Sequence, residues 1–290
     1  MNKRAFFNII LAGLLWGTSG VFVHFLAPLG FSSVQMTAMR AVVSAFVICI
    51  YVLISDKSLF KVSIKELLMF LVSGIFIFLT ATLYYAAMQM SSVSTAVMLM
   101  YTAPIFVLIY SVSFLGEKLN LIKVLSIFGM IAGCAFVSGI IGGMKFNVIG
   151  ILLGFASGIS YAIYNIATKI EMRHGSNPLS ATLYNFIFMS IIALLSCNAP
   201  KMFDLTMVNP MAAIPLMIGI GIFTCITPYF LYTLAIKELP VGVASALGII
   251  EPMAATIYSV VFFREELGLL PACGIVLIML SVVLLGKNKE

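Results

Sequence analysis

Charged side chains are scarce in this chain. Asp, Glu, Lys and Arg make up 9% of its 290 residues, whereas soluble domains carry about 25%. Hydrophobic residues make up 62%, and the mean hydropathy is +1.18. This composition excludes a soluble globular domain and predicts that nearly all of the chain lies in a membrane.

Cysteine and histidine are also few, and neither is clustered. The five cysteines are scattered without a CxxC pair, and there are two histidines. The pattern indicates neither a disulfide framework nor a metal site. The phosphate-binding sequence GxxxxGK[ST] is absent as well, so we expect no ATP hydrolysis by this chain and no cofactor.

The sequence offers little for an enzyme or a scaffold. An intramembrane enzyme would need paired acids, a Ser/His arrangement or a metal cluster, but His24, Arg40 and Glu251 lie in separate apolar runs. A membrane scaffold or receptor would need long loops for partners, and the polar breaks here are short. We therefore expect a transporter rather than an enzyme, with a non-transporting scaffold as a distant alternative.

Ten apolar runs are long enough to cross a bilayer, which takes roughly 20 residues as a helix. Backbone groups in lipid must be satisfied within a helix or a closed barrel, and continuous apolar runs exclude barrel strands. The sequence thus predicts an all-α integral membrane protein. The expected spans are Phe6–Ala27, Ser33–Ile54, Glu66–Met88, Ser92–Phe114, Val124–Gly142, Val148–Lys169, Ser180–Cys197, Ala213–Ile236, Val241–Phe263 and Leu269–Gly286.

The basic residues predict the orientation of these spans. With a cytoplasmic N-terminus, 12 of the 16 lie inside and three outside, and the last, Arg40, lies within a span. This bias favours cytoplasmic N- and C-termini and a bacterial cytoplasmic membrane. It also accounts for the net charge of +6, so no nucleic-acid partner is expected. The inside residues are Lys3, Arg4, Lys57, Lys61, Lys65, Lys118, Lys123, Lys169, Arg173, Lys237, Lys287 and Lys289.

Two stretches, Tyr84–Leu119 and Tyr232–Leu267, align without a gap at an offset of 148 residues. Identical pairs include Tyr84/Tyr232, Ala96/Ala244, Pro104/Pro252, Tyr110/Tyr258, Phe114/Phe262 and Glu117/Glu265. We predict two repeats, residues 1–143 and 144–290. Because each holds five spans, an odd number, the second must cross the membrane in inverted orientation. Inverted membrane repeats with prolines inside spans are typical of secondary transporters.

At this point the residues resemble a known family. Trp16-Gly17, Arg40, YTAPIFVLIYSVSFLGEKL at Tyr101–Leu119 and IIEPMAATIYSVVFFREEL at Ile249–Leu267 are similar to the drug/metabolite transporter superfamily, specifically its ten-span EamA type. The resemblance implies two inverted five-helix repeats around a central cavity lined by the first, third, fourth, sixth, eighth and ninth spans. It implies transport of amino acids, nucleosides, amines, drugs or other metabolites, without indicating which.

Glu251 is the strongest candidate functional residue. It lies near the middle of the ninth span, where an ionised carboxylate costs several kcal/mol unless it is paired or hydrated. It could couple transport to protons or neutralise a cationic substrate; alternatively, a protonated Glu251 could cap the backbone loosened by Pro252 or make a hydrogen bond to a neighbouring helix. Pro104 and Pro252 each remove a backbone donor and should kink their helices, which favours a hinge or shaping role.

Two other ionisable residues lie inside spans. Arg40 could neutralise an acidic substrate, but we favour a structural role with its head group pointing outward or bonding carbonyls at a helix end. His24 lies about one turn from the outer end of the first span. It could relay protons, or it could make an ordinary interhelical hydrogen bond.

The remaining candidates are polar and aromatic residues in spans that the resemblance assigns to the cavity. Asn165 shares a helix face with Tyr161 and is a candidate neutral substrate contact. The rings could stack on a substrate or hold an amine, and each could equally be helix packing. The aromatic candidates are Trp16, Tyr84, Tyr101, Tyr161, Tyr229 and Tyr232.

These observations favour a proton-coupled exporter of a small polar or amphipathic metabolite, working by alternating access. Amino-acid-like, aromatic or cationic compounds are the favoured substrates. An importer or uniporter of a nutrient such as a quaternary amine or a nucleoside is the alternative. The expected partners are the substrate, the lipid bilayer and protons, and the oligomeric state stays open.

Overall fold

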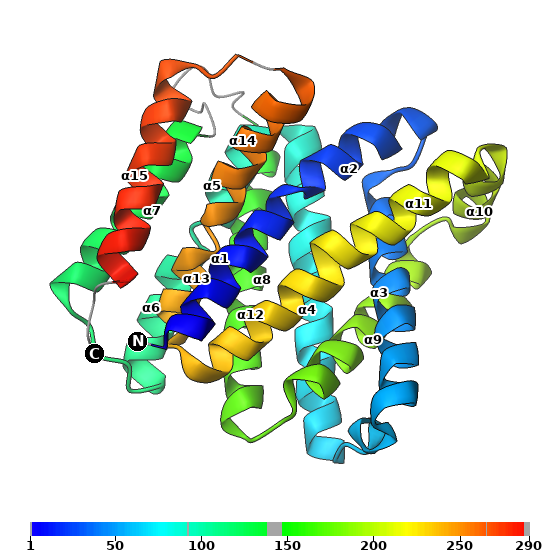
Figure 1. Cartoon of the computed structure of the whole chain (residues 1–290), viewed down its shortest axis with the longest axis horizontal. Helices are drawn as coiled ribbons and strands as arrows, with labels where there is room; N and C mark the ends of the chain where they lie inside the picture. Colours follow the sequence, from blue (N-terminus) through cyan, green and yellow to red (C-terminus); the bar gives the residue numbers. More distant parts are fainter. Residues whose placement is uncertain (1, 92, 138–146, 265, 287–290) are drawn as a thin grey trace.

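The computed structural model describes residues 2–91, 93–137, 147–264 and 266–286, and this part of the chain contains helices and no strand. The first half holds α1 (Lys3–Gly17), α2 (Ser19–Leu26), α3 (Ser33–Ser55), α4 (Ile64–Met90), α5 (Val93–Met100), α6 (Ala103–Phe114) and α7 (Leu121–Val137). The second holds α8 (Val148–Arg173), α9 (Pro178–Ser196), α10 (Ala199–Val208), α11 (Pro210–Gly221), α12 (Thr227–Glu238), α13 (Val241–Leu247), α14 (Ile250–Phe263) and α15 (Leu269–Gly286). The all-α prediction is confirmed (Figure 1).

Nine helical segments of the described chain are long and apolar enough to cross a membrane. The tenth predicted span, Val124–Gly142, corresponds to α7, a shorter apolar helix of 17 residues. Its predicted end at Gly142 lies outside the described residues, and so does the predicted boundary between residues 143 and 144.

Local sequence explains where several helices begin. Ser32 and Ser63 each accept a hydrogen bond from the backbone three residues on, and Gln35 and Glu66 bond back, which makes two complete capping boxes. Pro178 and Pro210 occupy the first turns of α9 and α11, where a missing N–H costs nothing.

Four predicted spans are interrupted rather than continuous. The first divides at Thr18 into α1 and α2, the fourth into α5 and α6, and the ninth into α13 and α14. The eighth contains a π-helical segment, Ile222–Ile226, between α11 and α12. The connection between the seventh and eighth spans, predicted to be a short loop, contains the helix α10.

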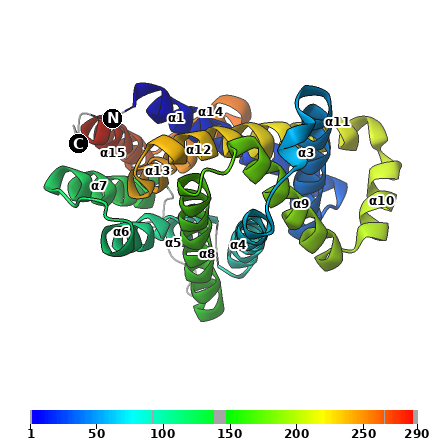
Figure 2. The ribbon, with the colours of Figure 1, turned by 90° about the horizontal axis from the view of Figure 1, so that it is seen from below.

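The two halves pack as an inverted pair, as predicted. α1 packs on α12 just as α8 packs on α4, and α1 packs on α14 just as α8 packs on α5 and α6. The remaining equivalent helices pair with each other, α3 with α9 and α7 with α15, which lie side by side in both views (Figures 1 and 2). These inter-repeat contacts thus have counterparts when the repeats are exchanged.

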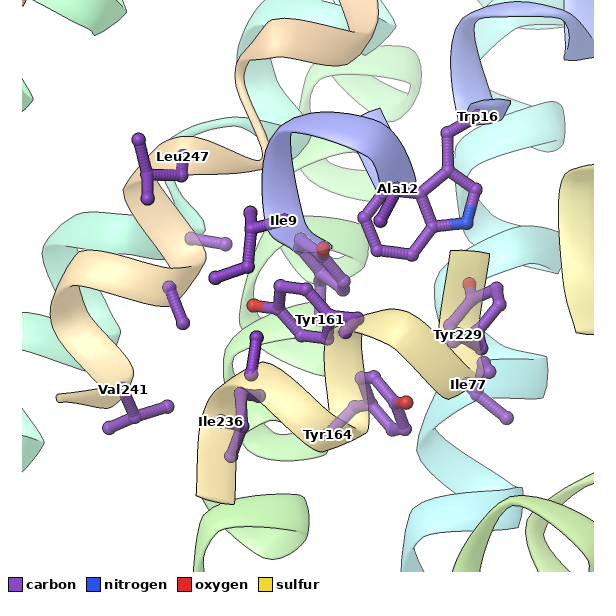
Figure 3. Packing of buried hydrophobic residues seen from close by; sticks show 14 of the residues in the cluster. Ile9, Ala12, Trp16, Ile77, Tyr161, Tyr164, Tyr229, Ile236, Val241 and Leu247 are labelled. Atoms are coloured by element: carbon purple, nitrogen blue, oxygen red, sulfur yellow. The ribbon is translucent and has the colours of Figure 1, made fainter. Parts of the chain in front are cut away.

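The buried core lies where α1, α4, α8 and α12 meet. Ile9, Ala12 and Trp16 of α1 pack beside Tyr161 and Tyr229 (Figure 3). Glycines allow the closest approaches: a Cβ at Gly158 of α8 would lie 2.8 Å from the carbonyl oxygen of Leu99. This contact brings α8 against the point where α5 gives way to α6.

Candidate functional site

A cavity of about 510 Å³ lies between the repeats. Its walls come from α1 and α2, α3, α4, α5, α8, α12 and α14. Five of the predicted substrate-binding residues line it: Trp16, Tyr84, Tyr161, Tyr229 and Glu251. It extends from these residues to Ser33, at the beginning of α3, and so reaches the end of the bundle opposite the start of α1.

Glu251 lies in the first turn of α14 and is partly exposed to the cavity. The hydroxyl of Tyr101 donates a hydrogen bond to its carboxyl Oε2 at 2.5 Å. Tyr101 belongs to the first repeat and Glu251 to the second, so this bond joins the repeats. It holds one carboxyl oxygen in place.

Both helix breaks precede a proline. Pro104 and Pro252 lack the N–H that would continue the helical hydrogen bonds. At the first break Thr102 N donates to Leu99 O at 3.2 Å, and at the second Ile249 N donates to Ala246 O at 3.1 Å. These three-residue spacings are tighter than those of an α-helix. Each break therefore follows from local sequence, and the offset of 148 residues relates them.

Arg40 requires a correction. From the sequence we expected its head group to point away from the protein or to bond carbonyls at a helix end. Instead, Arg40 is 8% exposed and lines the cavity. Its Nε is buried and has no hydrogen-bond partner in the described part of the chain. The reason is helix rotation: the face of α3 that carries Arg40 turns toward the bundle, where Ser44 one turn later bonds Gly221 O at 3.2 Å.

Three of the predicted site residues lie behind the cavity wall. Asn165 is fully buried, donates to Tyr161 O at 2.6 Å and accepts a hydrogen bond from the Tyr232 hydroxyl. The Tyr232 ring packs 5.3 Å from that of Trp16, and Tyr101 reaches Glu251 from the break between α5 and α6. These side chains support cavity-lining residues, and the cavity lining does not include them.

His24 lies apart from the other candidates. It is exposed on α2, with its ring 4.1 Å from that of Phe263. It lines a hollow of about 340 Å³ together with Ser259. This hollow adjoins the cavity that contains Glu251, because both are lined by Gly17, Gly20, Val23 and Ala255, but His24 itself does not line that cavity.

The sequence analysis did not predict that two ionisable residues of α8 are buried. Glu171 and Lys169 lie in the last turns of α8, beyond or at the predicted end of the sixth span. Glu171 is fully buried and accepts a hydrogen bond from Ser73 at 2.5 Å. Tyr164, Thr168 and Glu171 are spaced so that they lie on one helix face. This spacing could have indicated that Glu171 is buried. Thr80, Ser33 and Met36 also line the cavity and carried no signal of their own.

Polar contacts join helix ends on the side away from Ser33. The Lys169 ammonium donates to the carbonyl oxygens of Ile236 and Leu239, both at 2.7 Å. Arg173 donates to Leu115 O at 2.7 Å, and Glu117 accepts from Val241 N at 2.6 Å. This group of contacts, which we call the end latch, ties α8 and the α6 end to the α12–α13 connection.

Comparison with known proteins gives the family. The sequence matches the EamA-like transporter family over residues 3–139 and again over residues 148–287. The chain belongs to this family. The EamA match occurs twice, so each match covers five of the predicted spans.

EamA relatives match along almost the whole length. An uncharacterized transporter of Archaeoglobus fulgidus is 27% identical, with 97% of this chain and 95% of the relative aligned. The uncharacterized transporter YwfM of Bacillus subtilis is 23% identical, with 96% and 92% aligned. A solved crystal structure with 17% identity superposes with a TM-score of 0.81 and covers 98% of this chain and 96% of the other, which shows a shared fold. The chain is thus a multi-pass membrane transporter.

Proposed function

We propose that this EamA protein is a secondary active transporter that exports a small polar or amphipathic metabolite in exchange for protons, by alternating access. The volume of the cavity, about 510 Å³, supports this because small-molecule sites typically span about 300–1,000 Å³. Its aromatic walls favour amino-acid-like, aromatic or cationic compounds. The partners in this proposal are the substrate, the lipid bilayer and the proton.

The observation that carries the proposal is the position of Glu251. It is the acid that lines the cavity, it is accessible from that cavity, and Tyr101 of the other repeat holds it. An uncompensated carboxylate at membrane depth costs several kcal/mol, so exchange of its charge for a proton or a cationic group would change the energy of the site. Because the Tyr101 bond spans the repeats, that change would act on their relative position.

Location and orientation complete the proposal. We place the protein in a bacterial cytoplasmic membrane with both termini cytoplasmic, on the basis of the basic loops. The cavity then faces the exterior and the end latch faces the cytoplasm. The repeats are assigned to residues 1–143 and 144–290.

An importer or uniporter of a nutrient such as a quaternary amine or a nucleoside is the second candidate. The aromatic lining of the cavity favours this second candidate, because several rings surround one space, those of Trp16, Tyr84, Tyr85 and Tyr229. Such rings bind quaternary ammonium groups and nucleobases.

The test is a flux screen in proteoliposomes. Amino acids, amines and nucleosides are offered with and without an imposed pH gradient to the wild type and to Glu251→Gln. The control is Asp204→Asn, which removes an exposed acid on α10. We expect gradient-dependent flux of one compound class, its loss in Glu251→Gln and its retention in the control. Gradient-driven accumulation that survives Glu251→Gln would refute the coupling role, and flux indifferent to the gradient in the wild type would indicate a uniporter.

A further inference from the structure

The cavity contains a cation, Arg40, that forms no ion pair within the part of the chain that the structure describes. Arg40 is 8% exposed, its buried Nε has no acceptor, and among the described residues no ion pair joins it to Glu251. Cys225, Tyr85, Tyr229 and Glu251 lie within electrostatic range of it. A guanidinium at membrane depth costs several kcal/mol unless it is paired or hydrated. Glu251 is therefore near Arg40, but no described carboxylate lies within ion-pair distance of the guanidinium.

A second donor lines the same cavity without an acceptor. Trp16 is 5% exposed, and its indole Nε1 has no hydrogen-bond partner among the residues that the structure describes. Its ring packs beside that of Tyr229 (Figure 3), with the ring centroids 5.1 Å apart. Tyr229 also lies within electrostatic range of Arg40. Buried N–H groups are paired in the great majority of cases. Two unpaired donors on residues that line one cavity indicate that the acceptor comes with the ligand.

Glu251 supplies the opposite charge to Arg40 in the same cavity. The Tyr101 hydroxyl donates a hydrogen bond to Oε2 of Glu251, which is a partly exposed residue that lines the cavity. Glu251 belongs to α14 and Arg40 to α3, so the two charges come from different repeats. A ligand that contacts both would have one charge of each sign.

We propose that Arg40 and the indole N–H of Trp16 bind the carboxylate of a zwitterionic substrate whose ammonium group faces Glu251. The planar guanidinium matches a carboxylate in a way that a compact ammonium does not. The proposal rests on the proposed transport function and narrows its substrates to compounds that carry both charges. Simple amines and simple acids each leave one charge of the cavity unpaired.

A matched set of compounds tests this on the wild-type protein. In proteoliposomes, L-phenylalanine is compared with phenethylamine, which lacks the carboxylate, and with 3-phenylpropionate, which lacks the amine; the other protein amino acids are screened with them. We expect an amino acid to be transported. The decarboxylated and deaminated forms of that amino acid should compete about 10- to 100-fold more weakly, because each loses a hydrogen bond to a charged group. Competition by the decarboxylated amine equal to that by the amino acid would overturn the proposal.

Variants locate the carboxylate contact. Arg40→Gln should weaken amino-acid binding about 10- to 100-fold while leaving phenethylamine binding unchanged or stronger. Trp16→Phe, which keeps a ring and removes the N–H, should weaken amino-acid binding less. Lys201→Gln, an exposed position on α10, is the control. An equal loss for both compounds in Arg40→Gln, with a lower melting temperature, would indicate a structural arginine and overturn the proposal.

The outcomes separate this inference from the transport proposal. If Arg40→Gln does not fold, the compound series on the wild type still decides the question. Flux of amines or nucleosides without a carboxylate would refute the zwitterion site and leave the transport function standing. Absence of flux for the entire screen would refute both.

Discussion

Lys169 offers the sharpest test of the end latch. Its ammonium, 8% exposed, donates to two carbonyl oxygens, those of Ile236 and Leu239, at 2.7 Å each. The two carbonyls lie at the end of α12 and just beyond it, where a helix leaves acceptors without intrahelical donors. Lys169→Met keeps the length and apolar stem of the side chain and removes both bonds.

The magnitude follows from two opposing effects. Each hydrogen bond to a charged group contributes about 1.5–3 kcal/mol, but removal of the buried ammonium also removes its desolvation cost, which is several kcal/mol. We expect a net loss of about 1–3 kcal/mol for the closed arrangement of this end. That loss changes the ratio of closed to open forms by about 5- to 150-fold.

Cysteine accessibility measures that ratio. Ala244→Cys, in a background that lacks the native cysteines, places a thiol at a fully buried position on α13 near the latch. Its reaction rate with a charged thiol reagent should rise in proportion to the open population in Lys169→Met. Lys237→Met is the matched control, because Lys237 is an exposed lysine in the last turn of α12. An unchanged rate in Lys169→Met, or an equal rise in the control, would refute the assignment of the latch.

Two further substitutions test packing. Gly158→Val should lower the free energy of unfolding by about 1–3 kcal/mol, because its Cβ would lie 2.8 Å from Leu99 O. Thermal melting of this variant is compared with that of Gly20→Ala, where a Cβ meets nothing within 4 Å. Equal losses of stability in the two variants would contradict the prediction. Ser73→Ala should cost about 1–3 kcal/mol, because it removes the donor to buried Glu171; in a double-mutant cycle with Glu171→Gln, strictly additive losses would show that the bond contributes nothing.

The repeat and its broken helices could be predicted because local sequence determines them. A proline removes the same backbone donor wherever it occurs, so the pair Pro104 and Pro252 indicated two related irregular points before any packing was known. The division at Thr18 has no proline to announce it, and Thr18 instead bonds its own helix, its hydroxyl donating to Leu15 O at 2.6 Å. Such a break depends on tertiary packing.

Side-chain direction could not be predicted in the same way. A span rich in apolar residues on every side has no distinct buried face, so the sequence of α3 did not reveal that Arg40 turns inward. Similarly, α8 continues past the apolar run to Arg173, which buries Glu171 and Lys169 at positions that composition assigns to a loop. The contact between Tyr101 and Glu251 joins residues 150 positions apart and arises only when the repeats dock.

The arrangement of bonds suggests how the two ends of the bundle could exchange accessibility. Both helix breaks lie within the bundle, and the Tyr101–Glu251 bond joins the repeats beside them. The latch, by contrast, uses backbone carbonyl and amide groups at helix ends, which water can satisfy once Lys169, Arg173 and Glu117 withdraw. Opening this end therefore leaves few groups without a partner, whereas separating the repeats at their centre would leave Glu251 without its donor. Under the proposed transport function, we expect a rocking motion about the Tyr101–Glu251 contact, and a proton or substrate bound at Glu251 would act at its pivot.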